Sequence, residues 1–579
     1  MNRDTASQGR AQLRSVRRES RSLYWVVAIF SLVVNLLMLT GPLYMLNVYD
    51  RVLGSRSLET LIALSVLVGF LYAMMGVLDY TRGRIMARVG AKFQARLDRR
   101  VFAAVMKATT MNRAPTEAAT GLRDLESVQR MITSPVLMAL FDLPWAPLFV
   151  VGIFIFHPFM GYLALAGGAI LIAVALANQL STRRPLERAN QMTHQAEFTG
   201  QQIRAESELV HSLGMRDAAF SRWQDARDQS LGAAISASDL AGSYTALTKA
   251  FRLFLQSAML GLGAYLVLQG ELTPGAMIAG SILLGRALAP IELLIGQWPV
   301  LQRGREGWHN LGVLLGDIPE DVARTALPTP KAVIDAQQVT VVPPGEQQAA
   351  VRMISFKVQP GQAVGVIGTS GSGKSTLARA LTGVWRPAGG KIRLDGAALD
   401  QYDPDTLGKH IGYLPQRVQL FDGTIKDNIA RMSQAPDDSE VIKAAKRAAA
   451  HEMILKLPDG YDTLVSANGG RLSGGQIQRI GLARAMYGDP VVLVLDEPNS
   501  NLDNDGSVAL NQAIRVMKDE DRVVFIMAHR PAAIEQCDML LVIEGGAMRA
   551  FGPKDKILAD MVSNHQDIKK SVGKGGGVT

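Results

Sequence analysis

The sequence has almost no cysteine: Cys537 is the only one among 579 residues. An intrachain disulfide framework and a cysteine-rich zinc site are therefore excluded. Because Cys537 lies in the strand-like run "IEQCDMLLVI", we expect it to be a buried, inert thiol. A cleavable signal peptide is also lacking, since the first apolar run is too long for one and no small-residue cleavage pattern follows it.

Acidic residues are fewer than basic ones, which gives a net charge of +9. Basic charge alone would allow nucleic-acid binding, but it also fits the positive-inside bias of a membrane protein. Hydrophobic residues make up 48% of the chain and are concentrated before about residue 300. A chain of this length is too long for one core, so we expect two domains.

Six apolar runs in the first half each approach the ~20 residues that a membrane-spanning helix needs. The connections at 81–135 and 180–246 are long, polar and helix-like. The runs lie at about 23–46, 59–80, 136–157, 159–179, 247–270 and 274–297.

Basic residues are gathered in the leader and in the two long connections, as in "TRGRIMARVGAKFQARLDRR" and "STRRPLER". The positive-inside rule places these segments in the cytoplasm. Six spans then return the chain to the cytoplasm for everything after residue 300. The cytoplasmic location of these segments thus explains the excess of basic residues, and no nucleic-acid partner is expected.

Beyond the linker the sequence changes to short β-rich runs, glycine turns and helical stretches, which is typical of an α/β domain. "AVGVIGTSGSGKSTLARAL" predicts a strand, a phosphate-binding loop and a helix. Its backbone amides would face phosphates, Lys374 would reach the β- and γ-phosphates, and Ser375 would bind Mg²⁺. The predicted ATP-binding residues of this loop are Gly368, Thr369, Ser370, Gly371, Ser372, Gly373, Lys374, Ser375 and Thr376.

Two further patterns extend this nucleotide site. "VVLVLDEP" reads as a buried strand that ends in adjacent acids, with Asp496 placed to hold Mg²⁺ and Glu497 to polarise the attacking water. "LSGGQIQR" opens a second helix N-terminus that could bind an anion. One nucleotide does not need two such termini from one chain, whereas two chains facing head to tail would use both. The predicted residues of this second terminus are Leu472, Ser473, Gly474, Gly475 and Gln476.

The phosphate loop, "LSGGQ" and "VLDEP", in this order, closely resemble the ATP-binding cassette (ABC) ATPases over about residues 330–560. The resemblance implies ATP and Mg²⁺ as cofactors. It also implies that Gln416 is a catalytic and Mg²⁺-binding glutamine, that Asp503 crosses a dimer interface, and that His529 contacts the γ-phosphate.

The resemblance also implies the architecture, which is an all-α six-helix transmembrane domain fused to an α/β P-loop cassette. We expect the boundaries to be a basic leader at 1–22, a transmembrane domain at 23–315, a linker at 316–332, a cassette at 333–563 and a flexible tail at 564–579.

Two positions depart from the family pattern. Upstream of the phosphate loop the family usually places an aromatic residue on adenine, but here Val342 and Pro343 stand in that region, so we expect an aliphatic adenine contact by Val342. A glutamate often precedes "LSGGQ" in exporters, whereas this sequence has Ala467 and Asn468. Communication between the nucleotide site and the membrane domain would then use other residues.

The segments "GPLYMLNVYDRVLGSRSLETL", "FDLPWAPLF" and "DEPNSNLD" resemble the protease-secreting (RTX) branch of type I secretion exporters. This resemblance implies an inner-membrane homodimer that exports an unfolded protein with a C-terminal signal. A periplasmic membrane fusion protein and an outer-membrane channel would be its partners. The leader of about 22 residues is expected to be too short for an N-terminal peptidase domain. The alternatives are an exporter of a glycan, lipid or drug, and a heterodimer with a degenerate partner.

Charged residues within the apolar spans call for an explanation, because a charge in the membrane is costly. They are Asp142, Arg252, Arg286 and Glu292. In one interpretation Asp142 merely caps the helix that begins at Leu143 and Pro144. In the other, the four line a polar vestibule that receives unfolded polypeptide.

Overall fold

The computed structural model describes residues 3–112, 115–320, 324–466, 472–499, 504–528 and 534–560. The chain divides into two compact units, one made of residues 1–109 and 113–320 and the other of residues 110–112 and 321–579. The first unit is helical and the second is α/β, which confirms the predicted fold class. The division falls within the predicted linker, and the predicted tail lies outside the described residues.

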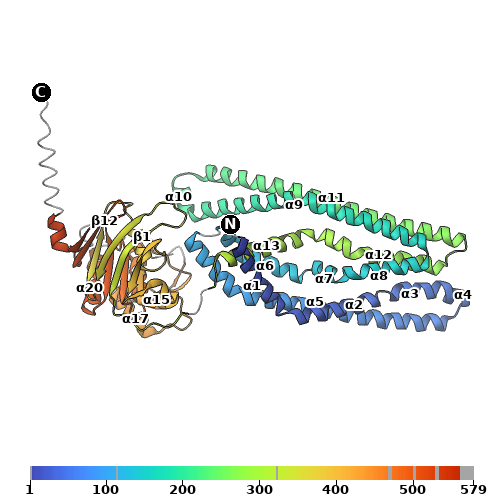
Figure 1. Cartoon of the computed structure of the whole chain (residues 1–579), viewed down its shortest axis with the longest axis horizontal. Helices are drawn as coiled ribbons and strands as arrows, with labels where there is room; N and C mark the ends of the chain where they lie inside the picture. The colour runs from blue at the N-terminus through green and yellow to red at the C-terminus, as the bar shows by residue number, and fades with distance from the viewer. Residues whose placement is uncertain are drawn as a thin grey trace, which may run out of the picture. The chain divides into compact units, whose positions relative to one another are not determined.

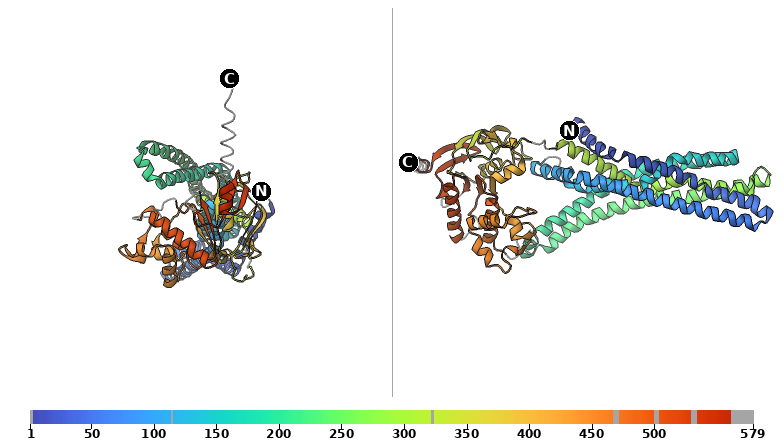
Figure 2. Two further views of the ribbon diagram at one scale, coloured as in Figure 1. Left: turned by 90° about the vertical axis from the view of Figure 1, so that its left-hand side faces the viewer. Right: turned by 90° about the horizontal axis from the view of Figure 1, so that it is seen from below.

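The helical unit consists mainly of long helices that run along a common direction (Figures 1 and 2). Its elements are α1 (Arg3–Arg18), α2 (Arg21–Leu37), α3 (Thr40–Asn47), the π-helix η1 (Val48–Val52), α4 (Leu53–Ser55), α5 (Leu58–Met111), α6 (Pro115–Thr133), α7 (Pro135–Asp142), the 3-10 helix η2 (Leu143–Trp145), α8 (Ala146–Phe156), α9 (Pro158–Ala205), α10 (Ser207–Ser212), α11 (Arg216–Leu268), α12 (Pro274–Gly296) and α13 (Trp298–Asp317).

Six stretches of the described chain are long and apolar enough to cross a membrane, which confirms the six predicted spans. They are Arg21–Ser55, Leu58–Met111, Pro135–Phe156, Pro158–Ala205, Arg216–Leu268 and Pro274–Gly296.

Three spans continue far beyond their apolar part. Helices α5, α9 and α11 have 54, 48 and 53 residues, which at 1.5 Å per residue is more than twice the length that a bilayer core requires. The long polar connections predicted as helix-like are these extensions, and α9 and α11 run side by side with α10 between their ends (Figure 1).

The apolar part of α5 shows why this unit needs a membrane. Ile62, Val66, Phe70 and Val77 recur along it, and each is more than half exposed. A soluble protein rarely leaves such a continuous apolar surface uncovered. Lipid tails cover it without cost, so we assign this face to the bilayer.

The basic leader forms a packed helix, α1, that lies against α13. Small residues bring the two backbones together: a Cβ added to Gly9 would lie 2.1 Å from the carbonyl oxygen of Gly312, and one added to Gly316 would lie 2.1 Å from that of Thr5. Leu13 is fully buried in the core formed with α5, α6 and α13. The leader is therefore an integral part of the helical unit.

The prediction that Asp142 caps a helix is wrong. Asp142 precedes η2, but its side chain makes no capping hydrogen bond. Its carboxylate accepts hydrogen bonds from the Arg82 guanidinium at 2.7 and 3.1 Å and from the Asn35 amide at 2.9 Å. Arg82 also donates to Ser31 and Asp79. This buried cluster joins α2, α5 and α7.

The second unit is built on a ten-stranded sheet in the order β5-β4-β1-β2-β12-β11-β3-β10-β9-β6, beside a two-stranded sheet, β7-β8. The strands from β11 to β6 are parallel, and those from β5 to β2 are antiparallel. The strands are β1 (Ile334–Val341), β2 (Val351–Val358), β3 (Ala363–Ile367), β4 (Gly389–Leu394), β5 (Ala397–Ala398), β6 (Ile411–Leu414), β7 (Gly423–Thr424), β8 (Leu464–Val465), β9 (Val492–Asp496), β10 (Val523–Ala528), β11 (Met539–Glu544) and β12 (Ala547–Pro553).

The helices of this unit cover the sheet and form two cores with it. Cys537 lies in one of these cores, is 3% exposed and forms no disulfide, and burial raises its pKa to about 12. The predicted inert thiol is thus confirmed. The helices are α14 (Lys374–Leu381), η3 (Leu399–Gln401), α15 (Pro404–His410), α16 (Ile425–Ile429), α17 (Asp438–Arg447), α18 (His451–Leu455), η4 (Gly460–Asp462), α19 (Gly474–Met486) and α20 (Asn504–Asp519).

The buried ion pair yields a stability prediction. Asp142→Leu should lower the free energy of unfolding by about 3–5 kcal/mol, because it leaves the Arg82 guanidinium buried without its partner. The double variant Arg82→Leu/Asp142→Leu removes both charges and should recover most of that loss. Arg84→Leu, which removes an exposed arginine two residues further along α5, is the control. Melting temperatures in one detergent measure all four proteins, and an Asp142→Leu protein as stable as the unmodified chain would contradict the assignment.

Candidate nucleotide site

Three loops of the nucleotide site follow β3, β9 and β6, which belong to the parallel part of the sheet, with β10 between β3 and β9. In register, Ala528 pairs with Ile367, Met527 with Asp496, and Leu495 with Leu414. The carboxyl ends of β3, β9 and β6 therefore meet at one edge of the sheet, where open α/β sheets bind ligands. This arrangement brings the phosphate loop, the paired acids and the segment with Gln416 together.

The phosphate loop connects β3 to α14 by a turn that only glycine tolerates. Gly371 and Gly373 have φ angles of +76° and +100°, where a Cβ is unfavourable. A Cβ on Gly373 would also lie 2.3 Å from the carbonyl oxygen of Ala350. The backbone can thus wrap closely around a bound group, with the N-terminus of α14 behind it.

Lys374 is nearly buried, with 5% of its surface exposed. Its ammonium donates hydrogen bonds to the carbonyl oxygens of Gly368 and Thr369, at 3.0 and 2.9 Å. Burial lowers the pKa of Lys374, while Glu497 and Asp496 nearby oppose that shift. The cation is therefore held at the loop by neutral carbonyls, which a phosphate oxygen can replace as a stronger, charge-assisted partner.

The two acids that follow the buried strand β9 have different partners. Asp496 is 2% exposed and accepts a hydrogen bond from the Ser375 hydroxyl at 3.1 Å, and burial raises its pKa. Glu497 has a positive φ of 51°, which turns its side chain out of the strand. Its carboxylate accepts a hydrogen bond from the Gln416 amide at 2.9 Å, a contact that the sequence did not reveal.

The signature segment forms the predicted second helix N-terminus, at α19. Ser473 is the N-cap residue: its hydroxyl accepts a hydrogen bond from the Gln476 amide, and the Gln476 side chain accepts one from the Ser473 amide. Ser473 and Gly474 are exposed. This chain thus presents a well-formed anion-binding terminus on the surface of its cassette.

Sequence reasoning missed the side chains that connect α19 to the two catalytic segments. Gln478, which is nearly buried, donates to the carbonyl oxygen of Pro498, the residue after Glu497. Arg484 donates to the carbonyl oxygen of Gln419 at 2.8 Å and to the side chain of Asn428 at 2.7 Å. A polar residue on the buried face of a helix is the signal that could have identified Gln478.

The remaining predicted site residues have varied outcomes. Val342 directly follows β1 and is half-buried, and its contact with adenine stays a prediction. Asp503 and His529 lie outside the described residues, as do Ala467 and Asn468. In the helical unit Arg252 forms an ion pair with Glu292 at 2.9 Å, whereas Arg286 forms none with the described residues.

The geometry fits a nucleoside triphosphate. The loop offers a buried ammonium, a helix N-terminus and the Ser372 hydroxyl, which is buried and has no hydrogen-bond partner among the described residues. An unsatisfied buried hydroxyl is costly, and a bound acceptor would satisfy it. The site therefore combines phosphate binding with a carboxylate, Glu497, positioned to act on water.

Comparison with known proteins agrees with this chemistry. The ABC transporter family profile matches residues 351–500, and that of the ABC transporter transmembrane region matches residues 24–288. A solved structure described as a bacterial Atm1-family ABC exporter with ATP bound has a TM-score of 0.80 and 23% identity, covers 94% of this chain and 98% of its own, and supports the fold.

Curated relatives narrow the family. The type I secretion system ATP-binding protein PrsD of Rhizobium meliloti is 42% identical over 97% of this chain and 96% of its own length. The cyclolysin secretion/processing ATP-binding protein CyaB of Bordetella pertussis is 30% identical over 93% of this chain and 76% of its own length. This chain therefore belongs to the ABC transporters, in which an ATPase drives transport, and within them to the ATP-binding proteins of type I secretion.

Proposed function

We propose that two copies of this chain form a homodimer in which each cassette completes the nucleotide site of the other. The observation that carries this proposal is the exposed, fully capped N-terminus of α19, at Ser473 and Gly474. A phosphate loop already supplies the anion site for one nucleotide, so the second terminus in the same chain serves the nucleotide of the partner copy.

ATP would bind with its phosphates on the loop between β3 and α14, where Lys374 exchanges its carbonyl partners for phosphate oxygens. Mg²⁺ fits the oxygen ligands Ser375, Asp496 and Gln416 and supplies charge neutralisation when bound. Glu497, turned out of β9 and held by Gln416, orients and polarises the attacking water. From the resemblance, His529 would contact the γ-phosphate and Asp503 the dimer interface.

ATP turnover would drive export of an unfolded polypeptide. The chain is a multi-pass membrane protein of the inner membrane, and we propose cytoplasmic N- and C-termini from the basic leader and basic helix extensions. A periplasmic membrane fusion protein, an outer-membrane channel and a client with a C-terminal signal complete the pathway. The alternative of glycan, lipid or drug export is set aside, because both curated relatives described above are named for protein secretion.

The polar residues of the spans divide into two groups. Asp142 is committed to Arg82, and Arg252 is paired with Glu292. Arg286, near the middle of α12, is partly exposed and has no ion-pair partner among the described residues. An unpaired mid-span arginine costs ~2.5–3.5 kcal/mol by insertion scales, which a water-filled path would relieve. We therefore place Arg286 on the polypeptide path.

Substitution of Lys374 and Glu497 separates nucleotide binding from hydrolysis. Lys374→Ala should weaken ATP binding about 10- to 100-fold, because a hydrogen bond to a charged group contributes about 1.5–3 kcal/mol. Glu497→Gln should leave binding within a few-fold and slow turnover by at least about 100-fold, because it removes the base. Lys391→Ala, an exposed lysine on β4, is the control. Near-normal turnover in Glu497→Gln would remove Glu497 from the catalytic role.

Substitution of the two span arginines tests the export path. Arg286→Gln should reduce client secretion while leaving basal ATPase activity and melting temperature close to those of the unmodified chain. Arg252→Gln, the matched control, leaves Glu292 without its partner and should lower the melting temperature as well. Secreted client, ATPase rate and melting temperature are measured on the same preparations. Normal secretion in Arg286→Gln would contradict the assignment of Arg286 to the path.

A further inference from the structure

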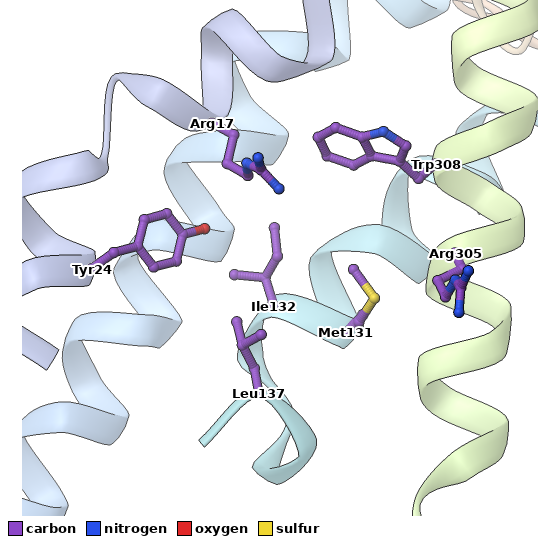
Figure 3. Close-up of a pocket in the computed structure, with 7 residues that line it drawn as sticks. All are labelled: Arg17, Tyr24, Met131, Ile132, Leu137, Arg305 and Trp308. Carbon is purple, nitrogen blue, oxygen red and sulfur yellow. The ribbon is translucent and has the colours of Figure 1, made fainter. Parts of the chain in front are cut away.

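A cavity of about 480 Å³ lies in the helical unit, where the leader helix meets the spans. Figure 3 shows its lining, in which the Arg17 side chain points between the rings of Tyr24 and Trp308 toward Ile132. Met131, Leu137 and Arg305 complete the lining. The walls are therefore mostly apolar and aromatic, and the two charged groups are both guanidinium cations.

Neither arginine is neutralised by an acid among the described residues. Arg17 packs over the Trp308 ring at 5.6 Å. Within the described residues, neither Arg17 nor Arg305 forms an ion pair. The nearest acid in sequence to Arg17, Glu19, is engaged by Lys92 and Arg96 of α5.

The acid next to Arg305 in the sequence, Glu306, is not its ion-pair partner either. Burial raises the pKa of Glu306, and the charges of Asp124 and Glu187 raise it further, while His194 opposes this shift. Glu306 forms no ion pair with Arg305 in the described part of the chain. On α6, Arg130 pairs with Glu126, and neither residue lines the cavity. The cavity thus has a net positive charge with no internal counter-ion.

The cavity lies beside the first residues of two of the apolar spans. Arg17 and Tyr24 flank the junction of α1 with the first span, and Ile132 and Leu137 flank the junction of α6 with the third span. Those spans begin at Arg21 and Pro135. With the cytoplasmic leader proposed above, this level corresponds to the headgroups of the inner leaflet.

From these observations we propose that the cavity binds one anionic phospholipid of the inner leaflet. Its phosphate would lie near Arg17 and Arg305, and its glycerol and first acyl carbons would contact Ile132, Leu137 and the two aromatic rings. Basic pockets between membrane helices on the cytoplasmic side suit such headgroups. The apolar walls favour a lipid over a free anion, because a free anion would leave them in contact with water or empty space.

A bound lipid would contact α1, α2, α6, α7 and α13 at one point. It would thereby hold the leader helix against the first span, in addition to the glycine contacts between α1 and α13. Anionic lipid becomes a structural ligand of the full-length chain, independent of the nucleotide site.

The test measures binding of phosphatidylglycerol to the full-length protein in detergent, by native mass spectrometry and by the rise in melting temperature. Phosphatidylcholine and inorganic phosphate are the comparison ligands. The unmodified chain should retain phosphatidylglycerol and gain stability from it, whereas the two comparison ligands should have little effect. An equal rise in melting temperature with inorganic phosphate would overturn the lipid assignment in favour of a small-anion site.

Two variants test the residues. A basic residue near a leaflet surface contributes about fivefold in affinity, so Arg17→Gln/Arg305→Gln should weaken phosphatidylglycerol binding by about 25-fold. Arg14→Gln/Arg303→Gln removes the same charge from the same helices, at residues that are exposed as Arg17 and Arg305 are but do not line the cavity, and should bind almost normally. Leu137→Trp keeps the charges but places a bulky ring in the apolar part of the cavity, and should also weaken lipid binding. Equal losses in the two double variants, or normal binding by Leu137→Trp, would overturn the proposal.

A photoreactive amino acid at Met131 identifies the occupant in secreting cells. An adduct with the mass of a phospholipid supports the proposal, and an adduct with the secreted polypeptide overturns it. Melting temperatures without added lipid ensure that each variant is folded, so that a loss of binding is not mistaken for unfolding.

Discussion

The nucleotide site of the cassette depends on a buried ammonium group whose hydrogen-bond partners are neutral. Lys374 has lost most of its hydration and is held by two loop carbonyls, which compensate only part of the cost of burying a charge. A triphosphate relieves this cost. The rest of the site is organised around the same point, because parallel strands bring Asp496 and Glu497 beside the loop and Gln416 holds Glu497. The affinity for nucleotide therefore arises from an environment that the empty fold satisfies incompletely.

A second buried charge lies in the helical unit, and its hydrogen-bond partners include acidic side chains. Arg82 donates hydrogen bonds to Asp142, Asp79 and Ser31 of the same chain. These bonds stabilise the packing of three helices, and the guanidinium needs no ligand. Arg286 and the pair Arg17 and Arg305 lack such acids among the described residues. The contrast between arginines with an acidic partner and arginines without one separates structural residues from those that we assign to polypeptide and lipid.

Patterns of local origin were predictable from the sequence, and contacts between distant segments were not. Neighbouring residues predict the six spans, the phosphate loop and the helix that begins after Ser473. The reason is that the length of an apolar run, the spacing of glycines and the identity of an N-cap residue are all properties of a short segment. The interpretation of Asp142 as a helix cap was wrong, since its partner Arg82 lies 60 residues away and no pattern near Asp142 indicates it. The bonds of Gln416 to Glu497 and of Gln478 to Pro498 were missed for the same reason. The packing of the leader on α13 depends on Gly9 and Gly312 meeting, which only the fold reveals.

The central claim is that each nucleotide site is shared between two copies of the chain, and mixed dimers test it most directly. Chains with Ser473→Arg are combined with chains carrying Lys374→Ala, and ATPase activity is compared with that of each variant alone. In a mixed dimer one site carries both substitutions and the other carries neither. If the sites are shared, hydrolysis should reappear on mixing. Mixed dimers that are shown to form and yet remain as inactive as either parent would contradict it.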